Sequence, residues 1–182
     1  STNPGEHLEK LSGNAYHTYL RLTPGLRAIT DGPETGMEPP VNGKRHEVLQ
    51  GFDETDIFPF GGLLQPLKTD PGTITLMTFI PQFPVYPPET AWMREPKTNI
   101  PGLIINNKNQ GSRIVFLPAD IDRQFGLNNL PDHGNLLGNI TRWASNGNIL
   151  LNVEGAGLVD CHLYKQAGRL VLHVINLTSA AT

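Results

Sequence analysis

Two histidines near the carboxyl end of the chain have the residue type and spacing of metal ligands. His162 and His173 flank the dipeptide Ala167-Gly168, which can form a two-residue β-turn. Such a turn pairs positions whose numbers add to about 335, so it places His162 directly opposite His173. Cross-strand neighbours lie about 5 Å apart at Cβ, and Asp160 shares their face. The spacing allows a metal site with Asp160 as a third ligand. We favour the alternative, two histidines on a half-exposed sheet face that share hydrogen bonds or cover a neighbour.

Two carboxylates form a second candidate site. Asp120 and Asp122 follow the apolar run Arg113–Pro118, and the ligands of open α/β sheets bind beyond the carboxyl ends of strands. Carboxylates two positions apart can hold a divalent cation or act as an acid–base pair. Arg123 is the next residue, however, and aspartates at strand ends commonly cap turns. We therefore favour a structural role for this pair, with ligand binding as the alternative.

An aromatic and proline-rich segment at residues 79–94 is a third candidate. It contains Phe83, Tyr86 and Trp92, and Arg94 closes it. Prolines restrict the backbone, so little conformational entropy is lost when these aromatic side chains contact another molecule. Three interpretations remain open: a long connection held against its own domain, a contact surface for a protein, and a surface for a sugar.

Nucleophilic catalysis and phosphate binding have no motif in this sequence. It contains no Gly-x-Ser-x-Gly elbow, no Gly-x-Gly-x-x-Gly run and no phosphate-binding loop. The single cysteine, Cys161, cannot form an internal disulfide. It is expected opposite Val174 on the apolar face of the hairpin, where it would fill a core. We expect no cofactor.

The elements that must position these residues are a strand-rich mixture of helix and strand. One amphipathic helix is predicted at Asp132–Ser145, with Asp132 as its N-cap. The alternating run Thr73–Ile80 has one slip, at Met77, which fits a bulge or burial on both faces. Arg113–Pro118 is nearly continuously apolar, which is typical of a central strand covered on both faces. Strands are also expected at Asn14–Arg21, Asp56–Phe60, Leu63–Lys68, Ile100–Asn106, Gly157–Lys165 and Arg169–Leu177, with a short helix inside residues 1–13 and a long loop at Thr23–Lys44.

Composition excludes several classes of protein. The 182 residues carry 14 Lys+Arg against 17 Asp+Glu, a balance that gives no basic footprint for nucleic acid. No apolar run approaches the roughly 20 residues that span a bilayer. The 16 prolines, all at or before Pro131, and the 19 glycines exclude a long helix or coiled coil. An apolar share of 38% and a net charge of only −3 argue against a disordered chain.

Several runs resemble a known family. Two runs resemble the end of a class I glutamine-amidotransferase-like domain. They are Arg113-Ile-Val-Phe-Leu-Pro-Ala-Asp-Ile-Asp-Arg123 and Leu130-Pro-Asp-His-Gly-Asn-Leu-Leu-Gly-Asn-Ile-Thr-Arg-Trp-Ala144. This flavodoxin-like domain forms the trimerisation domain of one β-galactosidase class and occurs in the ThuA-like proteins of trehalose utilisation. From about residue 14 to residue 182 the chain resembles a family of hypothetical bacterial glycoside hydrolases. Segments of the same style are His46–Phe52, Asp56–Gly62, Pro84–Arg94, Glu154–Tyr164 and Gly168–Thr178.

The resemblance implies an α/β, β-rich fold in two parts. Residues 1–147 would be the second part of a partial flavodoxin-like, amidotransferase-like domain of the trimerisation type. Residues 148–182 would begin a C-terminal β domain with a β-hairpin. In this family a TIM barrel carrying the catalytic carboxylates precedes the amidotransferase-like domain. That barrel would lie upstream of the sequence, as would the position of the amidotransferase cysteine, so the resemblance assigns no catalytic residue.

The function implied is that of a non-catalytic accessory or oligomerisation portion of a carbohydrate-active enzyme. We expect self-association or contact with the upstream catalytic barrel, through Phe83–Trp92 and Thr23–Lys44. The resemblance also implies a bacterial protein that is exported to the periplasm or cell surface. One alternative is a carbohydrate-binding module that uses Tyr86 and Trp92. The other is a small metal-dependent hydrolase built on Asp120, Asp122, His162 and His173.

Overall fold

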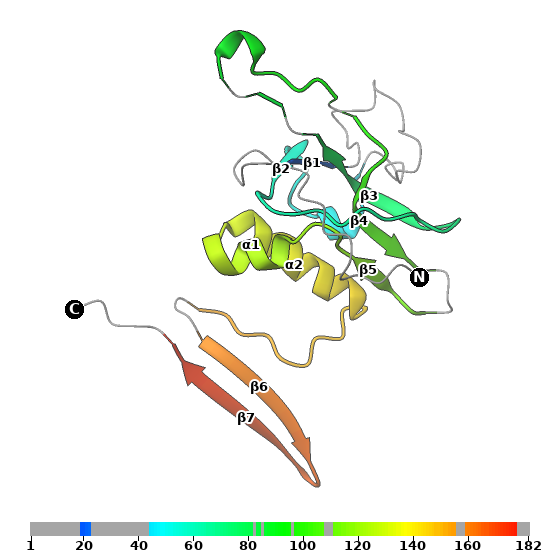
Figure 1. The fold of residues 1–182 in the computed structure, drawn as a ribbon. Helices are drawn as coiled ribbons and strands as arrows, with labels where there is room; N and C mark the ends of the chain where they lie inside the picture. Colours follow the sequence, from blue (N-terminus) through cyan, green and yellow to red (C-terminus); the bar gives the residue numbers. More distant parts are fainter. Residues whose placement is uncertain are drawn as a thin grey trace, which may run out of the picture. The chain divides into compact units, whose positions relative to one another are not determined.

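The computed structural model describes residues 19–22, 44–81, 83–84, 86–95, 97–107, 111–155 and 159–177. The expected N-terminal helix, residues 14–18 of the first expected strand and residues 23–43 of the expected long loop lie outside these ranges. The chain divides into two compact units, Ser1–Gly147 and Asn148–Thr182 (Figure 1). The fold is mixed α/β and rich in strands, with two antiparallel sheets and two α-helices in the described residues.

A five-stranded sheet forms the first unit, in the order β2-β1-β3-β4-β5. Every neighbouring pair in it runs antiparallel. Such pairs need only a chain reversal between neighbours, whereas the parallel strands of a doubly wound sheet need crossover helices. The strands are β1 Tyr19–Leu22, β2 Ile57–Pro59, β3 Ile74–Ile80, β4 Pro101–Asn106 and β5 Ile114–Phe116.

Strand β3 lies in the middle of the sheet and is buried on both faces from Thr75 to Ile80. Its pairing with β4 shifts register on both sides of Met77. The break in alternation therefore coincides with an irregular register and with burial on both faces, the two explanations that the sequence left open. A bulge inserts one residue into a strand and re-aims the side chains beside it, which is how an interrupted alternation still fits a paired strand.

Strand β5 is an edge strand, so the prediction of a central strand at Arg113–Pro118 is wrong. In the described sheet β5 pairs only with β4. Ile114 and Phe116 are 53% and 43% exposed, whereas Val115 packs partly against the core. The apolar run belongs to a strand with only one covered face.

The expected strand at Leu63–Lys68 does not form, which corrects a second prediction. Leu64 makes one isolated β-bridge with Ala119. Pro66 follows two residues later and has no N–H to donate, so pairing does not continue.

Two helices follow β5 along the chain, α1 Ile121–Asn128 and α2 Pro131–Ala144. The predicted long helix is confirmed by α2, but Asp132 is not its N-cap. Leu130 holds that position without a side-chain hydrogen bond, and the first helical residue is a proline with a preset φ. Helix α1 was not expected, because it is short and contains Gly126, a poor helix former.

One apolar core joins the sheet, both α-helices and the 3₁₀ turn η3 Glu47–Leu49. Each fully buried side chain of the leucine or phenylalanine class contributes roughly 1.5–3 kcal/mol of transfer free energy. This core holds η3 beside α2, and the two elements form the site described below. Its buried members include Leu20, Leu49, Phe58, Leu76, Leu103, Ile121, Leu136 and Trp143.

The second unit contains the antiparallel hairpin of β6 Val159–Gln166 and β7 Arg169–Asn176. Gln166 pairs with Arg169 and His162 pairs with His173, so the register predicted from the turn is confirmed. Gly168 has a φ of 76°, which the two-residue turn requires. Because side chains alternate along a strand, one face of the hairpin carries Val159, Cys161, Leu163, Leu170, Leu172 and Val174.

Candidate functional site

A polar groove lies in the first unit between α2 and the segment that contains η3. Two hollows of about 360 and 460 Å³ adjoin here, and both are lined by Gln50, Asn139 and Arg142. We call the two hollows together the α2 groove. The first is also lined by Glu47, Arg113, Trp143, Asn146 and Gly147, and the second by Gly51, Phe52 and Asn135.

Asn139 ties the two walls of the α2 groove together. Its Nδ2 donates to the Gln50 carbonyl at 2.8 Å and to the Val48 carbonyl at 3.3 Å. Both amide protons of Asn139 are thereby used, and its Oδ1 is left as an acceptor. The segment with η3 is therefore held at a set distance from α2, and the width of the groove is fixed by the fold.

Arg113 is the best-positioned charge in the groove. Its Nη1 donates to the Trp143 carbonyl at 3.1 Å, and its guanidinium carbon lies 5.3 Å from the centroid of the Trp143 ring. The side chain is partly buried. These contacts hold the guanidinium in one orientation before any ligand binds, which lowers the entropic cost of binding.

Arg142 and Glu47 bring two further charges to the same hollow. Within the described part of the chain, neither side chain forms an ion pair or hydrogen bond. Arg142 lies across Gly138, where a Cβ would stand 3.1 Å from Arg142 Nη1. The absence of a side chain at Gly138 thus gives the Arg142 guanidinium its place over the helix surface.

His46 does not line the groove but contacts the segments that do. Its Nδ1 accepts a hydrogen bond from the Val48 amide at 3.2 Å, and its ring meets Trp143 edge-on at a centroid distance of 5.2 Å. Burial lowers the pKa of His46 below its ordinary value, Glu47 opposes this shift, and Arg113 adds to it. His46 is therefore held in its neutral form.

We expect His46 to make the protein less stable as the pH falls below about 6.5. Above that pH the imidazole is neutral in both the folded and the unfolded chain and adds no pH dependence. As the pH falls through 6.5, the unfolded chain binds the proton first, because the folded pKa is lower. The free energy of unfolding then declines until the folded state is protonated too.

Urea denaturation between about pH 7 and pH 5 measures this effect. His46→Gln keeps an acceptor near the Val48 amide but does not titrate. Its free energy of unfolding should decline less over this range than that of the wild type. Equal declines in the two proteins would contradict the assignment of the pKa shift to this residue.

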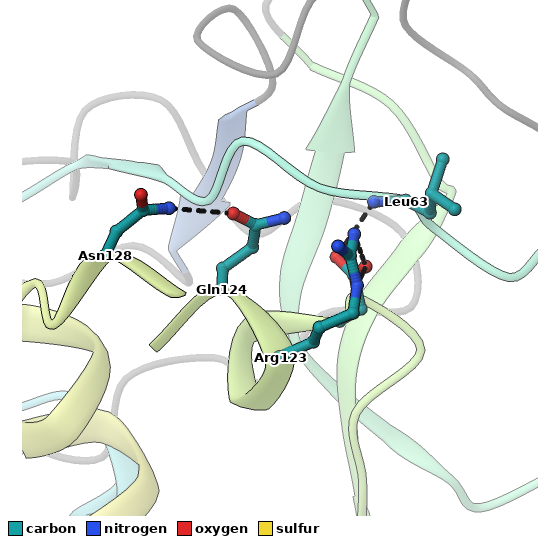
Figure 2. Close-up of polar contacts among 5 residues, drawn as sticks. Leu63, Arg123, Gln124 and Asn128 are labelled. Atoms are coloured by element: carbon teal, nitrogen blue, oxygen red, sulfur yellow. Dashed lines mark hydrogen bonds and ion pairs between the residues drawn. The ribbon is translucent and has the colours of Figure 1, made fainter. Parts of the chain in front are cut away.

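Asp120 has a structural role, because its carboxylate is hydrogen-bonded within the protein. Its Oδ1 accepts a hydrogen bond from the Leu63 amide at 2.8 Å, and its Oδ2 receives Nε and Nη2 of Arg123 at 2.8 and 2.5 Å (Figure 2). It stands at the N-cap of α1 and joins that helix to the chain before β3. Asp122 lies in the first turn of α1 and is exposed. Neither aspartate lines the α2 groove.

The aromatic residues separate into an anchored and an exposed set. The Phe83 ring stacks on Tyr19 of β1 at a centroid distance of 5.7 Å, whereas Tyr86 and Trp92 are 82% and 54% exposed. The guanidinium of Arg94 lies 5.0 Å from the centroid of the Trp92 ring. The segment between β3 and β4, with the 3₁₀ turn η4 Pro88–Thr90, extends away from the sheet and from both helices (Figure 1).

His162 and His173 lie opposite each other on one face of the β6–β7 hairpin. His162 Nε2 lies 3.0 Å from Asp160 Oδ2, and the centroid of the Tyr164 ring lies 6.4 Å from that of His162 and 5.4 Å from that of His173. In the described ranges no three His, Cys, Asp or Glu side chains gather in a way that could hold a metal ion. None of the described helices is both long enough and apolar enough to cross a membrane.

Sequence reasoning did not find the α2 groove. Its walls come from residues 47–52, 113 and 135–147, which are far apart in the sequence. A local signal existed only in α2, where Asn135, Asn139 and Arg142 recur at helical spacing away from the apolar face. No protein-family model, curated protein or solved structure matches the chain.

Proposed function

We propose that this chain is a non-catalytic interaction portion of a carbohydrate-active enzyme, and that it associates with a second copy of itself through residues 81–100. The observation that carries the proposal is the exposure of Tyr86 and Trp92 on a segment that leaves the body of the first unit. Large aromatic side chains dominate the energetics of protein interfaces, and their exposure on one projecting segment favours a contact role. We call residues 81–100 the aromatic arm.

Contacts with the sheet anchor both ends of the aromatic arm. Phe83 stacks on Tyr19, and the Thr98 hydroxyl donates to the Phe79 carbonyl at 2.5 Å. Several prolines lie between these two anchors, so the arm loses little entropy on binding.

The link to carbohydrate rests on the resemblance to the hypothetical glycoside hydrolases. The amidotransferase-like, flavodoxin-like assignment stays a prediction, and the antiparallel pairings of the described sheet do not support it. The proposal of self-association does not depend on that assignment, since it rests on the exposed side chains of the aromatic arm.

Trp92→Ala is expected to weaken self-association about tenfold or more, because a central aromatic contact is worth at least 2 kcal/mol. Sedimentation velocity of the full chain over a range of concentrations measures the dissociation constant. Leu127→Ala is the matched control, because Leu127 is also an exposed apolar side chain, 65% accessible, but belongs to α1. It should leave association unchanged.

A wild-type chain that stays monomeric at every concentration would overturn the proposal. Equal weakening by Trp92→Ala and Leu127→Ala would also overturn it, because the contact would then lie elsewhere. Calorimetric binding of a neutral oligosaccharide that Trp92→Ala abolishes, without any self-association, would instead support the carbohydrate-binding module.

A further inference from the structure

We propose that the α2 groove binds a small hydroxylated carboxylate of the sugar-acid class. The groove is separate from the aromatic arm, shares no lining residue with it and has a different chemistry. The proposal therefore stands or falls independently of self-association.

The charges of the groove favour a monoanion. Arg113 and Arg142 are positive, Glu47 is negative and His46 is held neutral, so the charged groups around the first hollow sum to one positive charge. A planar guanidinium matches a carboxylate through parallel N–H donors, and Arg113 is already fixed in orientation by Trp143. A phosphate dianion would exceed this charge and would meet the Glu47 carboxylate.

The remaining lining favours hydroxyl groups. The side-chain amides of Gln50 and Asn146 have no hydrogen-bond partner in the described part of the chain, and Asn139 Oδ1 is an acceptor. Glu47 can accept from a hydroxyl, whereas it would repel a second carboxylate. A hollow of about 360 Å³ suits a ligand of monosaccharide size. Carboxylate and hydroxyl groups together describe a sugar acid.

The probe is D-glucuronate, titrated into the full chain while backbone amide resonances are followed by NMR. We expect saturable shifts at Gln50, Asn139, Arg142 and Trp143. D-glucose, acetate and inorganic phosphate should each bind at least about tenfold more weakly than D-glucuronate, because each lacks either the carboxylate or the hydroxyl groups. Arg142→Gln should weaken glucuronate binding about tenfold or more.

Two variants sharpen the test. Glu47→Gln should weaken glucuronate binding relative to acetate binding severalfold, because only glucuronate has hydroxyls that donate to Glu47, whereas the loss of the negative charge favours both carboxylates. Arg123→Gln removes an exposed arginine of α1 that pairs with Asp120 and lines neither hollow, so it should change nothing. Thermal melting confirms that each variant remains folded.

Three results would overturn the proposal. One is the absence of saturable shifts with glucuronate. Another is equal binding of acetate and glucuronate, which would show a site for any carboxylate without hydroxyl recognition. The third is tighter binding of phosphate than of glucuronate, which would show a site for a dianion.

Discussion

Arg45→Met is expected to lower the free energy of unfolding by about 2–4 kcal/mol, because it leaves the partly buried carbonyls of Phe52 and Thr55 without their donor. The Arg45 side chain is only 2% exposed. Its Nη1 donates to the carbonyls of Phe52 and Thr55, and its Nη2 pairs with Asp56 Oδ1 at 2.8 Å. Methionine has a similar volume but donates nothing, so the variant leaves two carbonyls and a carboxylate without this partner.

The same substitution should disturb the α2 groove. The carbonyls that Arg45 binds belong to the turn after η3, and η3 forms one wall of the groove. Urea denaturation of the wild type and of Arg45→Met measures the loss of stability. Arg45→Lys, which keeps the charge but lacks the planar fork, should fall between them.

Asp56→Asn is the matched variant on the other side of the pair. The amide oxygen of asparagine can still accept from Arg45 Nη2, and the site of Asp56 is 45% exposed to solvent, so the cost should be clearly smaller than that of Arg45→Met. A loss below about 1 kcal/mol for Arg45→Met would show that the segment after η3 does not depend on this guanidinium.

Gly62→Ala is the second substitution with a large expected effect, a loss of about 2–4 kcal/mol. A Cβ at position 62 would stand 1.7 Å from Asp120 Oδ1, far inside van der Waals contact. The carboxylate cannot move aside freely, because the Leu63 amide and Arg123 hold it in place (Figure 2). Alanine therefore forces the Asp120 contacts apart.

Gly126→Ala is the control of opposite sign. Gly126 lies inside α1, and a Cβ there would meet nothing within 4 Å. Alanine is a better helix former than glycine, so this variant should gain about 0.5–1 kcal/mol. Chemical denaturation of both variants would then give shifts in opposite directions for the same change of side chain.

A double substitution tests the cause of the Gly62→Ala effect. Asp120→Ala removes the carboxylate that the new methyl group would strike. Gly62→Ala combined with Asp120→Ala should therefore cost less than the sum of the two single losses. Additive losses would show that the Gly62→Ala effect does not arise from the contact with Asp120.

Local sequence patterns were sufficient for several elements. The two-residue turn at Ala167-Gly168 predicted the hairpin register, because pairing outward from a tight turn follows its length. The broken alternation at Met77 predicted a bulge or burial on both faces, and the apolar periodicity before Gly147 predicted α2. In each case the determining interactions lie within a few residues of one another.

Local patterns failed where a distant partner decides the outcome. The apolar run of β5 suggests a covered strand, but its position at the sheet edge depends on which strands pair with β4. Asp120 resembled a candidate ligand, yet its carboxylate is taken by Leu63, 57 positions away in the chain. A single sequence shows which groups can form hydrogen bonds or ion pairs, but it does not show which distant residues the fold brings to them.

The residue types at both candidate surfaces were set by the sequence alone. The aromatic side chains of residues 79–94 and their prolines stood out at once, because they are close together in the chain. Which of them are anchored and which exposed was decided by tertiary packing, since Phe83 stacks on Tyr19 of another strand. The α2 groove belongs wholly to the tertiary structure: three separate segments supply Glu47, Arg113 and Arg142 to one hollow, and only the packing of η3 against α2 places them together.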